Sequence, residues 1–420
     1  MNIRTASTKG DQQKFHVHAG GQHGISPAAK VAEAASAEDL RSRVDKVVAV
    51  AAAHAASVDS ESRFPSEAIE AARAERLLGI AVPRELGGEG VDAAEVADIC
   101  YALGRACAST AMIYAMHQTK VACITRHGRG SGWHELMLRR LCAEQLLLAS
   151  STTEGQAGGD LRNSASAVAG DTRIALERQA TVISYGQDAD GIVTTARRSA
   201  DAASSDQVLL VLLKSDYTLE RLNGWNALGM RGTCSAGFKL VAAGLREQIL
   251  PVSYQTIHSH TMMPFAHLAW SSAWAGIAAA AVERARSFVR KATHRAGGTL
   301  PPGAAHFTRA SANLRTLRSL IASALDRFES ASKDVATLES LDFQTGMNML
   351  KVNASELAVA TVMSAMQACG LAGYRNDGEF SMGRHLRDIL SSPIMISNDR
   401  ILANVAAAAL LGATPASLRD

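Results

Sequence analysis

The chain has 420 residues, of which 47% are hydrophobic and 20% charged, and its formal net charge is +3. This length exceeds one ordinary hydrophobic core, so we expect two or three packed units. A charge this small for the size does not indicate nucleic acid or an anionic membrane as a partner. No apolar run approaches the roughly 18 residues that suggest a membrane span.

The N-terminus and the cysteines indicate the cellular compartment. Residues 1–30 are polar and lack the apolar stretch of a signal peptide. The six cysteines show no CxxC spacing, which is typical of reduced, mostly buried thiols in a cytosolic protein. We therefore expect a cytoplasmic protein without a metal site.

The first part of the chain combines a tail and a helical domain. Residues 1–28 hold scattered Gly, His, Gln and Ser without a period, which predicts a mobile tail. From residue 29 to 144 apolar residues recur at helix spacing, for example from Leu40 to Ala51. Asp92 and Glu95 have the spacing of a capping box, so we expect a helix to begin there. This part predicts an N-terminal helical domain.

The pattern changes between residues 145 and 250. Short runs rich in Val, Ile, Leu and Thr are separated by Gly, Asp and Ser, which is typical of strands in a compact β-domain. The predicted strands are 145–151, 181–185, 192–195, 208–213 and 238–241.

Helices return after residue 250 and continue to residue 420. Pro264 suits the first turn of a long helix, and the Gly/Pro-rich stretch 297–303 breaks the chain after it. Three further helical segments follow, and four such helices make a bundle. The predicted fold class is mainly α with a central β-domain, in the order α, β, α, with a C-terminal four-helix bundle.

The sharpest local motif, residues 152–160 (TTEGQAGGD), directly follows a predicted strand. Its small residues would let a ligand approach the backbone, and hydroxyls with bare N–H groups suit a polar ring edge or a phosphate. The glycine spacing is not that of a dinucleotide-binding or phosphate-binding loop. From the residues alone, an ordinary turn explains the motif equally well.

The same motif resembles the TEPGAGSD stretch of the acyl-CoA dehydrogenase superfamily. Four further stretches are similar to that family and occur in the same order. Each similarity alone is weak, but five matching stretches in the family's order are specific. They are 79–88 (GIAVPRELGG), 182–184 (VIS, where the family has Trp-Ile-Thr), 228–233 (LGMRGT) and 367–374 (QACGLAGY) followed by Arg387-Asp388.

The resemblance implies a flavin cofactor, FAD or FMN, and roles for individual residues. Thr153 would bind the isoalloxazine ring, and Ser184 its N5 edge. Gln367 and Gly370 would contact the adenylate end of the flavin in a neighbouring subunit, so the resemblance also implies a homotetramer or homodimer. The complete set of implied cofactor residues is Ser151, Thr152, Thr153, Gly158, Gly159, Val182, Ser184, Gln367, Gly370 and Asn398.

Three departures from the family pattern concern chemistry. Many relatives carry a catalytic Glu where this chain has Ile396, and others place it where this chain has Ala266. The family's Arg-x-x-Phe-Gly stretch is replaced by the loop 296–303. The catalytic residue is therefore open, and the candidates are His117, Glu379 and His267.

Three functions follow from these observations. The first is oxidation of an acyl thioester, linked to coenzyme A or to a carrier protein, by hydride transfer to flavin N5; a carboxylate normally removes the α-proton. The second is a two-component monooxygenase that uses reduced flavin from a separate reductase and O₂, as in the dibenzothiophene monooxygenase branch, and needs no such base. The third is a flavoprotein that kept the fold without catalysis.

Overall fold

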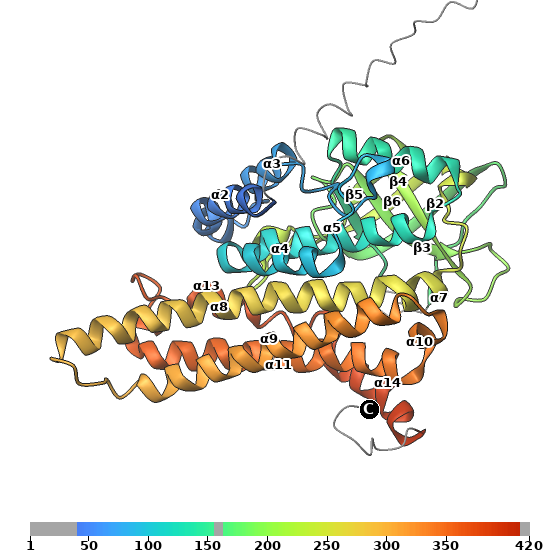
Figure 1. Cartoon of the computed structure of the whole chain (residues 1–420). Helices are drawn as coiled ribbons and strands as arrows, with labels where there is room; N and C mark the ends of the chain where they lie inside the picture. Colours follow the sequence, from blue (N-terminus) through green and yellow to red (C-terminus); the bar gives the residue numbers. More distant parts are fainter. Residues whose placement is uncertain (1–39, 155–162, 412–420) are drawn as a thin grey trace, which may run out of the picture.

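The computed structural model describes residues 40–154 and 163–411. The predicted tail, residues 1–28, lies outside these ranges. Helices occupy the chain to Glu144, strands lie between Leu148 and Leu245, and helices follow from Tyr254 (Figure 1). This order confirms the predicted α, β, α fold class, and we propose residues 145 and 250 as the limits of the three domains.

The N-terminal helices pack against one another and onto the long helix α8. The capping box is confirmed, since Asp92 Oδ1 accepts from Glu95 N at 2.9 Å and Asp92 N donates to Glu95 Oε2 at 3.0 Å. Helix α5 is buried on nearly every side. The helices are α2 (Leu40–Ser60), α3 (Ser66–Ala74), α4 (Ala93–Ala106), α5 (Ala108–His127) and α6 (Gly132–Glu144).

Six strands form two three-stranded sheets. In the first, β1 (Leu148–Ser151) pairs in parallel with β3 (Gly191–Arg197), which pairs antiparallel with β4 (Gln207–Leu213). The second is antiparallel with the order β2-β6-β5. Its central strand is β6 (Ala236–Leu245), and β5 (Tyr217–Arg221) lies at one edge.

The longest strand of the second sheet shows why its prediction began too late. Strand β2 (Arg173–Ile183) alternates exposed and buried residues along most of its length. Charged residues such as Arg173 and Glu177 occupy the exposed positions, so the apolar run recognised in the sequence covers only its end. Strand β5 was not predicted, because most of its side chains are not buried and no apolar alternation marks it.

Three long helices lie side by side and form most of the C-terminal bundle (Figure 1). They are α8 (Met263–Arg295), α9 (Ala304–Ala331) and α11 (Leu341–Cys369). Helix α14 (Asn398–Leu411) packs against α11 as the fourth member. Shorter segments join them: α7 (Tyr254–Ile257), the π-helical turn η5 (His258–Met262), α10 (Val335–Glu339), α12 (Leu371–Tyr374) and α13 (Gly383–Ile389).

Two glycines let α4 and α8 approach closely. A Cβ on Gly104 would lie 2.3 Å from Ala273 O, and a Cβ on Gly276 would lie 2.3 Å from Tyr101 O. Both distances are far below van der Waals contact, so only hydrogen fits at these positions. This contact fixes α8, which carries part of the site described below, against the N-terminal helices.

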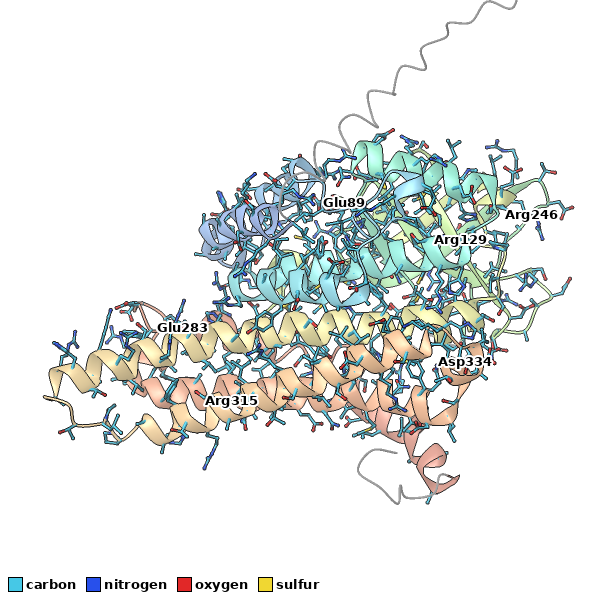
Figure 2. All side chains as sticks on the ribbon, in the orientation of Figure 1. Glu89, Arg129, Arg246, Glu283, Arg315 and Asp334 are labelled. Carbon is cyan, nitrogen blue, oxygen red and sulfur yellow. The ribbon has the colours of Figure 1, made fainter. Side chains whose placement is uncertain are left out.

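The continuous helical segment Tyr254–Arg295 is long and apolar enough, by length and composition, to cross a membrane, but 94% of its most apolar window is buried inside the protein. A helix apolar on all sides must be covered by other elements, and here α4, α5, α9 and α11 cover it. Charged side chains such as Arg246, Glu283 and Arg315 instead point outward from the surface (Figure 2). The segment therefore has the environment of a core helix.

Candidate active site

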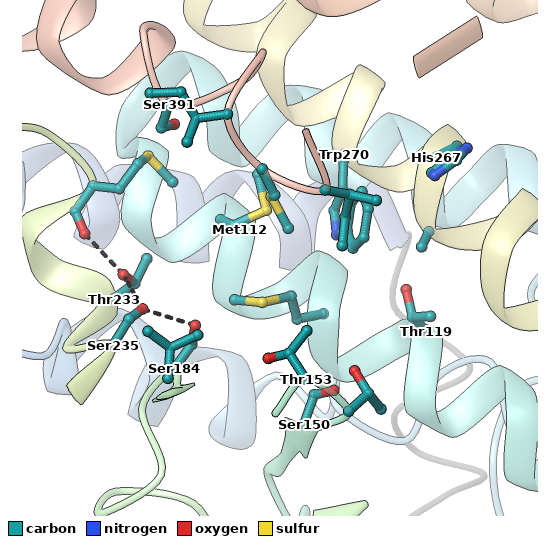
Figure 3. Close-up of a pocket in the computed structure, with 18 of the residues that line it drawn as sticks. Met112, Thr119, Ser150, Thr153, Ser184, Thr233, Ser235, His267, Trp270 and Ser391 are labelled. Atoms are coloured by element: carbon teal, nitrogen blue, oxygen red, sulfur yellow. Dashed lines mark hydrogen bonds between the residues drawn. The ribbon is translucent and has the colours of Figure 1, made fainter. Parts of the chain in front are cut away.

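A cavity of about 610 Å³ lies where the β-domain meets the helices (Figure 3). Its walls come from α5, the end of β1, the edge of the second sheet, the η5–α8 segment and the turn between α13 and α14. The size is within the range of about 300–1,000 Å³ typical of small-molecule and cofactor sites. Residues far apart in the sequence therefore converge on one binding space.

A row of hydroxyl groups forms one wall (Figure 3). Because a carbonyl can only accept, Thr233 Oγ1 donates to Met230 O at 2.8 Å. Ser235 Oγ then has to donate to Thr233 Oγ1, also at 2.8 Å, and Ser184 Oγ to Ser235 Oγ at the same distance. Each hydroxyl has one proton, so the free side of Ser184 Oγ offers lone pairs to the cavity.

The segment after β1 brings Thr152 and Thr153 to the cavity. The next residue, Glu154, is buried and pairs with Arg178 of β2 at 2.9 Å. Glu154 also accepts from Ala165 N at 2.5 Å and from Ser166 N at 3.3 Å. These contacts fix the backbone immediately beyond the two threonines.

Helix α8 supplies His267 and Trp270, whose ring centroids are 5.7 Å apart (Figure 3). His267 Nδ1 lies 3.0 Å from Met347 O, so this nitrogen carries the proton and donates. Burial lowers the pKa of His267 to about 3, which keeps the ring neutral. A group with this pKa is a weak base near neutral pH. Trp270 Nε1 is buried and has no partner among the described residues.

Asp388 holds the turn 228–233 against α13. Its Oδ1 accepts from Met230 N at 2.7 Å, and burial raises its pKa to about 6. A Cβ on Gly229 would lie 2.1 Å from Arg387 O, so the turn requires glycine there. The Arg387 side chain lines the cavity and forms an ion pair with Asp59.

Among the described residues that line the cavity, none is Asp or Glu. The two positions at which the resemblance implies a catalytic Glu both face it, but they hold Ile396 and Ala266. Ile396 has a φ of 57°, an unusual value for a β-branched residue and a sign of local strain. Within residues 40–154 and 163–411, no group of three His, Cys, Asp or Glu is placed to hold a metal ion.

Two of the three catalytic candidates lie away from the cavity. His117 is fully buried in the core, where Nε2 lies 2.8 Å from Leu78 O and Nδ1 accepts from Leu148 N at 3.0 Å. With both ring nitrogens bound to backbone, it has a structural role. Glu379 is exposed and paired with Lys291 at 2.6 Å. We therefore drop both as catalytic candidates, and His267 alone lines the cavity.

Four implied cofactor residues line the cavity: Thr152, Thr153, Val182 and Ser184. The buried side chain of Ser151 does not line it, and Asn398 instead accepts from Lys351 Nζ at 2.6 Å. Asn398 therefore anchors α14 to α11.

Two of the remaining implied cofactor residues, Gln367 and Gly370, do not line this cavity. Gln367 is exposed and lies 19 residues after the cavity-lining Asn348 on α11, about 28 Å along the helix. Its contact to a flavin in a neighbouring subunit, like that of Gly370, stays a prediction. Gly158 and Gly159 lie outside the described residues.

The sequence reasoning missed several residues of the cavity. Met112, Met116 and Lys120 follow one another at intervals of four on α5 and face it together. Lys120 was the available signal, because it is the one Lys, Arg, Asp or Glu between Ala108 and Ile124 and lysine is rarely fully buried.

Family models match both helical parts of the chain. The acyl-CoA dehydrogenase N-terminal domain matches residues 34–131, and the C-terminal domain of the same family matches residues 259–411. The two matches together cover more than half of the chain.

Individual proteins agree with this result. L-evernosamine nitrososynthase of Micromonospora sp. is 27% identical over 82% of each chain. Cyclohex-1-ene-1-carbonyl-CoA dehydrogenase of Geobacter metallireducens is 26% identical over 86% of this chain and 93% of its own. The structure of FMN-bound TdsC from Paenibacillus sp. A11-2, a dibenzothiophene monooxygenase, superposes with a TM-score of 0.76. It is 18% identical and covers 89% of this chain and 98% of its own. The chain belongs to the acyl-CoA dehydrogenase family of flavin-dependent oxidoreductases, whose cofactor is FAD or FMN.

Proposed function

We propose that the cavity holds the flavin ring and an apolar substrate together, and that the reaction is an oxygenation. The cavity suits such a ring, because it combines apolar side chains with hydroxyls at one wall and with the indole N–H of Trp270, which has no partner among the described residues. Thr153 and Ser184 would hold the polar edge of the ring. When bound in reduced form, the flavin supplies the two electrons that reduce one oxygen atom of O₂ to water while the other enters the substrate.

The absence of a carboxylate among the described lining residues carries this proposal. Removal of an α-proton from an acyl thioester needs a base over the reacting carbon. Ile396 and Ala266 occupy the two positions from which relatives supply it, and neutral His267 has a pKa of about 3. Oxygenation with reduced flavin does not require this base.

The hydroxyl wall supports the same choice. Ser184 Oγ donates to Ser235, so it can only accept from a ligand while this chain of hydrogen bonds is intact. Reduced flavin carries an N–H at N5, whereas the same nitrogen in oxidised flavin is an acceptor. Ser184 is therefore complementary to the reduced ring.

The proposal is tested by comparing two half-reactions of the flavin-loaded protein. On anaerobic mixing with a chain-length series of acyl-CoAs, the flavin is expected to bleach about 10²–10⁴-fold more slowly than in an enzyme with a positioned base. This factor is the usual contribution of such a base. Ile396→Glu is the matched variant, because it restores a carboxylate at the family position.

In the second half-reaction, chemically reduced flavin and oxygen-18-labelled O₂ are supplied with a neutral or a carboxylated aromatic compound, indole or indole-3-acetate. Transfer of one labelled oxygen atom to either compound is the expected result. Rapid bleaching of the wild-type protein by a simple acyl-CoA, without oxygen transfer, would contradict the proposal.

Thioester oxidation is the second candidate function. It is favoured by the similarity to cyclohex-1-ene-1-carbonyl-CoA dehydrogenase over most of both chains. The acyl group would be carried by coenzyme A or a carrier protein, and the anaerobic experiment above decides between the two reactions.

Replacing Thr153 with valine and Ser184 with alanine is expected to weaken flavin binding about tenfold. Each lost hydrogen bond costs about 0.5–1.5 kcal/mol, and both side chains line the cavity. Affinity is measured by titrating FMN and FAD into both proteins. Thr218→Val on the exposed face of β5 is the control, and an unchanged affinity in the double variant would remove the two residues from the flavin site.

We also propose a homotetramer or homodimer that assembles through the C-terminal helices, and a cytoplasmic location. Leu371, Tyr374 and Ile394 are 71–76% exposed in the single chain, and burial of such side chains drives association. A separate flavin reductase would supply the reduced cofactor for oxygenation.

A further inference from the structure

Lys120 is a buried amine in the wall of the cavity. It lies on α5 and is 4% exposed. Among the described residues its Nζ makes one hydrogen bond, to Met262 Sδ at 3.5 Å, and it forms no ion pair. A thioether sulfur is a weak acceptor, so the ammonium group has almost no compensation for the water that it loses.

Burial lowers the pKa of Lys120 to about 8, with a small opposing effect from Cys123. The side chain is therefore mostly protonated near neutral pH. A buried charge is normally paired, and an amine without a counterion that faces a binding space is typical of a ligand contact rather than of a structural element.

The described part of the cavity wall does not provide the missing charge. None of its described lining residues is acidic. The other basic side chains that line it cannot supply a negative charge: they are His258, Arg400, Arg387, which is paired with Asp59, and His267, which is neutral. A ligand that satisfies Lys120 therefore has to bring a negative charge with it.

We propose that Lys120 anchors a carboxylate of the substrate, so that the substrate is an apolar carboxylic acid. Met112 and Met116 precede Lys120 by two turns and one turn of α5 and also face the cavity, which places an apolar surface beside the anchor. This inference deepens the proposed function by naming the substrate class. Its test measures binding without turnover, so it can fail while the oxygenation proposal stands.

The test compares matched anionic and neutral probes by calorimetry on the flavin-loaded protein. The probes are phenylacetate with phenylacetamide, and hexanoate with hexanamide. Lys120→Met is expected to weaken both carboxylates about 10–100-fold, the usual cost of a lost hydrogen bond to a charged group, and to leave the amides unchanged. Lys120→Arg keeps the charge and is expected to retain the preference for the carboxylates. Lys333→Met, at an exposed site near the end of α9, is the control.

A second arm asks whether the flavin phosphate is the anion instead. FMN and riboflavin are titrated into the wild type and Lys120→Met. The proposal requires the same affinity ratio in both proteins. A loss confined to FMN, with carboxylate binding unchanged, would assign Lys120 to the cofactor phosphate and overturn the proposal. Equal binding of carboxylate and amide by the wild type would overturn it as well.

Discussion

Replacing Arg178 with methionine is expected to lower the free energy of unfolding by about 3–5 kcal/mol, because it leaves Glu154 as an unpaired buried charge. The two side chains are 1% and 2% exposed, and Arg178 Nη1 lies 2.9 Å from Glu154 Oε1. Arg178 also donates to Thr195 O of β3 at 2.5 Å. The pair therefore joins the two sheets and fixes the chain after Thr153.

The pH dependence of this loss follows from the carboxyl group. Burial alone would raise the pKa of Glu154, but Arg178 and the neighbouring N–H groups hold it below its ordinary value. The wild-type pair thus contributes stability above the pKa of the unfolded carboxyl and loses it as the pH falls through the lower folded value. In Arg178→Met, protonation of Glu154 removes the unpaired charge. The stability difference between wild type and variant should therefore become smaller as the pH falls toward about 4.

Chemical denaturation at several pH values measures both effects. The double variant Glu154→Gln with Arg178→Met should lose less stability than Arg178→Met alone, since no charge is left unpaired. Arg198→Met removes an exposed ion pair with Asp206 and should cost less than about 1 kcal/mol. A cost for Arg178→Met no larger than that of Arg198→Met would show that Glu154 is solvated.

Features that depend on neighbours in the sequence were predicted best. The capping box of Asp92 and Glu95 uses atoms three residues apart, so its pattern was sufficient. Strand β5 was missed because its position depends on pairing with β6 and its own sequence has no apolar pattern. Thr153 and Ser184 were placed at the site only through the family resemblance. From the residues alone, an ordinary turn explained Thr153 equally well, and an ordinary strand explained Ser184 better.

The parts of the site that the sequence did not reveal depend on distant contacts. Glu154 and Arg178 are 24 positions apart in the sequence and meet only when β1 and β2 are brought together. His117 was a catalytic candidate because the resemblance places its helix near the flavin, but its ring contacts Leu78 and Leu148, as expected of a core histidine. Lys120, three residues later, points to the cavity, and helix periodicity alone did not indicate which of the two would do so.

Lys120→Met is expected to stabilise the ligand-free protein by about 3 kcal/mol near neutral pH, because it removes a buried charge. The pKa of Lys120 falls from 10.5 to about 8 on folding, and each pKa unit corresponds to about 1.36 kcal/mol. Below about pH 8 the amine is charged in both states, and the folded state carries the full cost. Above about pH 10.5 it is neutral in both states, so the gain should disappear.

The measurement is the difference in unfolding between wild type and Lys120→Met across this pH range. Methionine has a similar length and fills the same apolar site, so the difference isolates the charge. Burial raises the pKa of the neighbouring Cys123 to about 12, and this thiol stays neutral throughout the range. A variant that is less stable than wild type near neutral pH would mean that the protein itself compensates the charge of Lys120, which removes the reason for a substrate carboxylate. Saturating phenylacetate is expected to stabilise only the wild type, and so to abolish the stability gain that Lys120→Met shows in the ligand-free protein. This result would connect the cost of burying Lys120 to its role in binding.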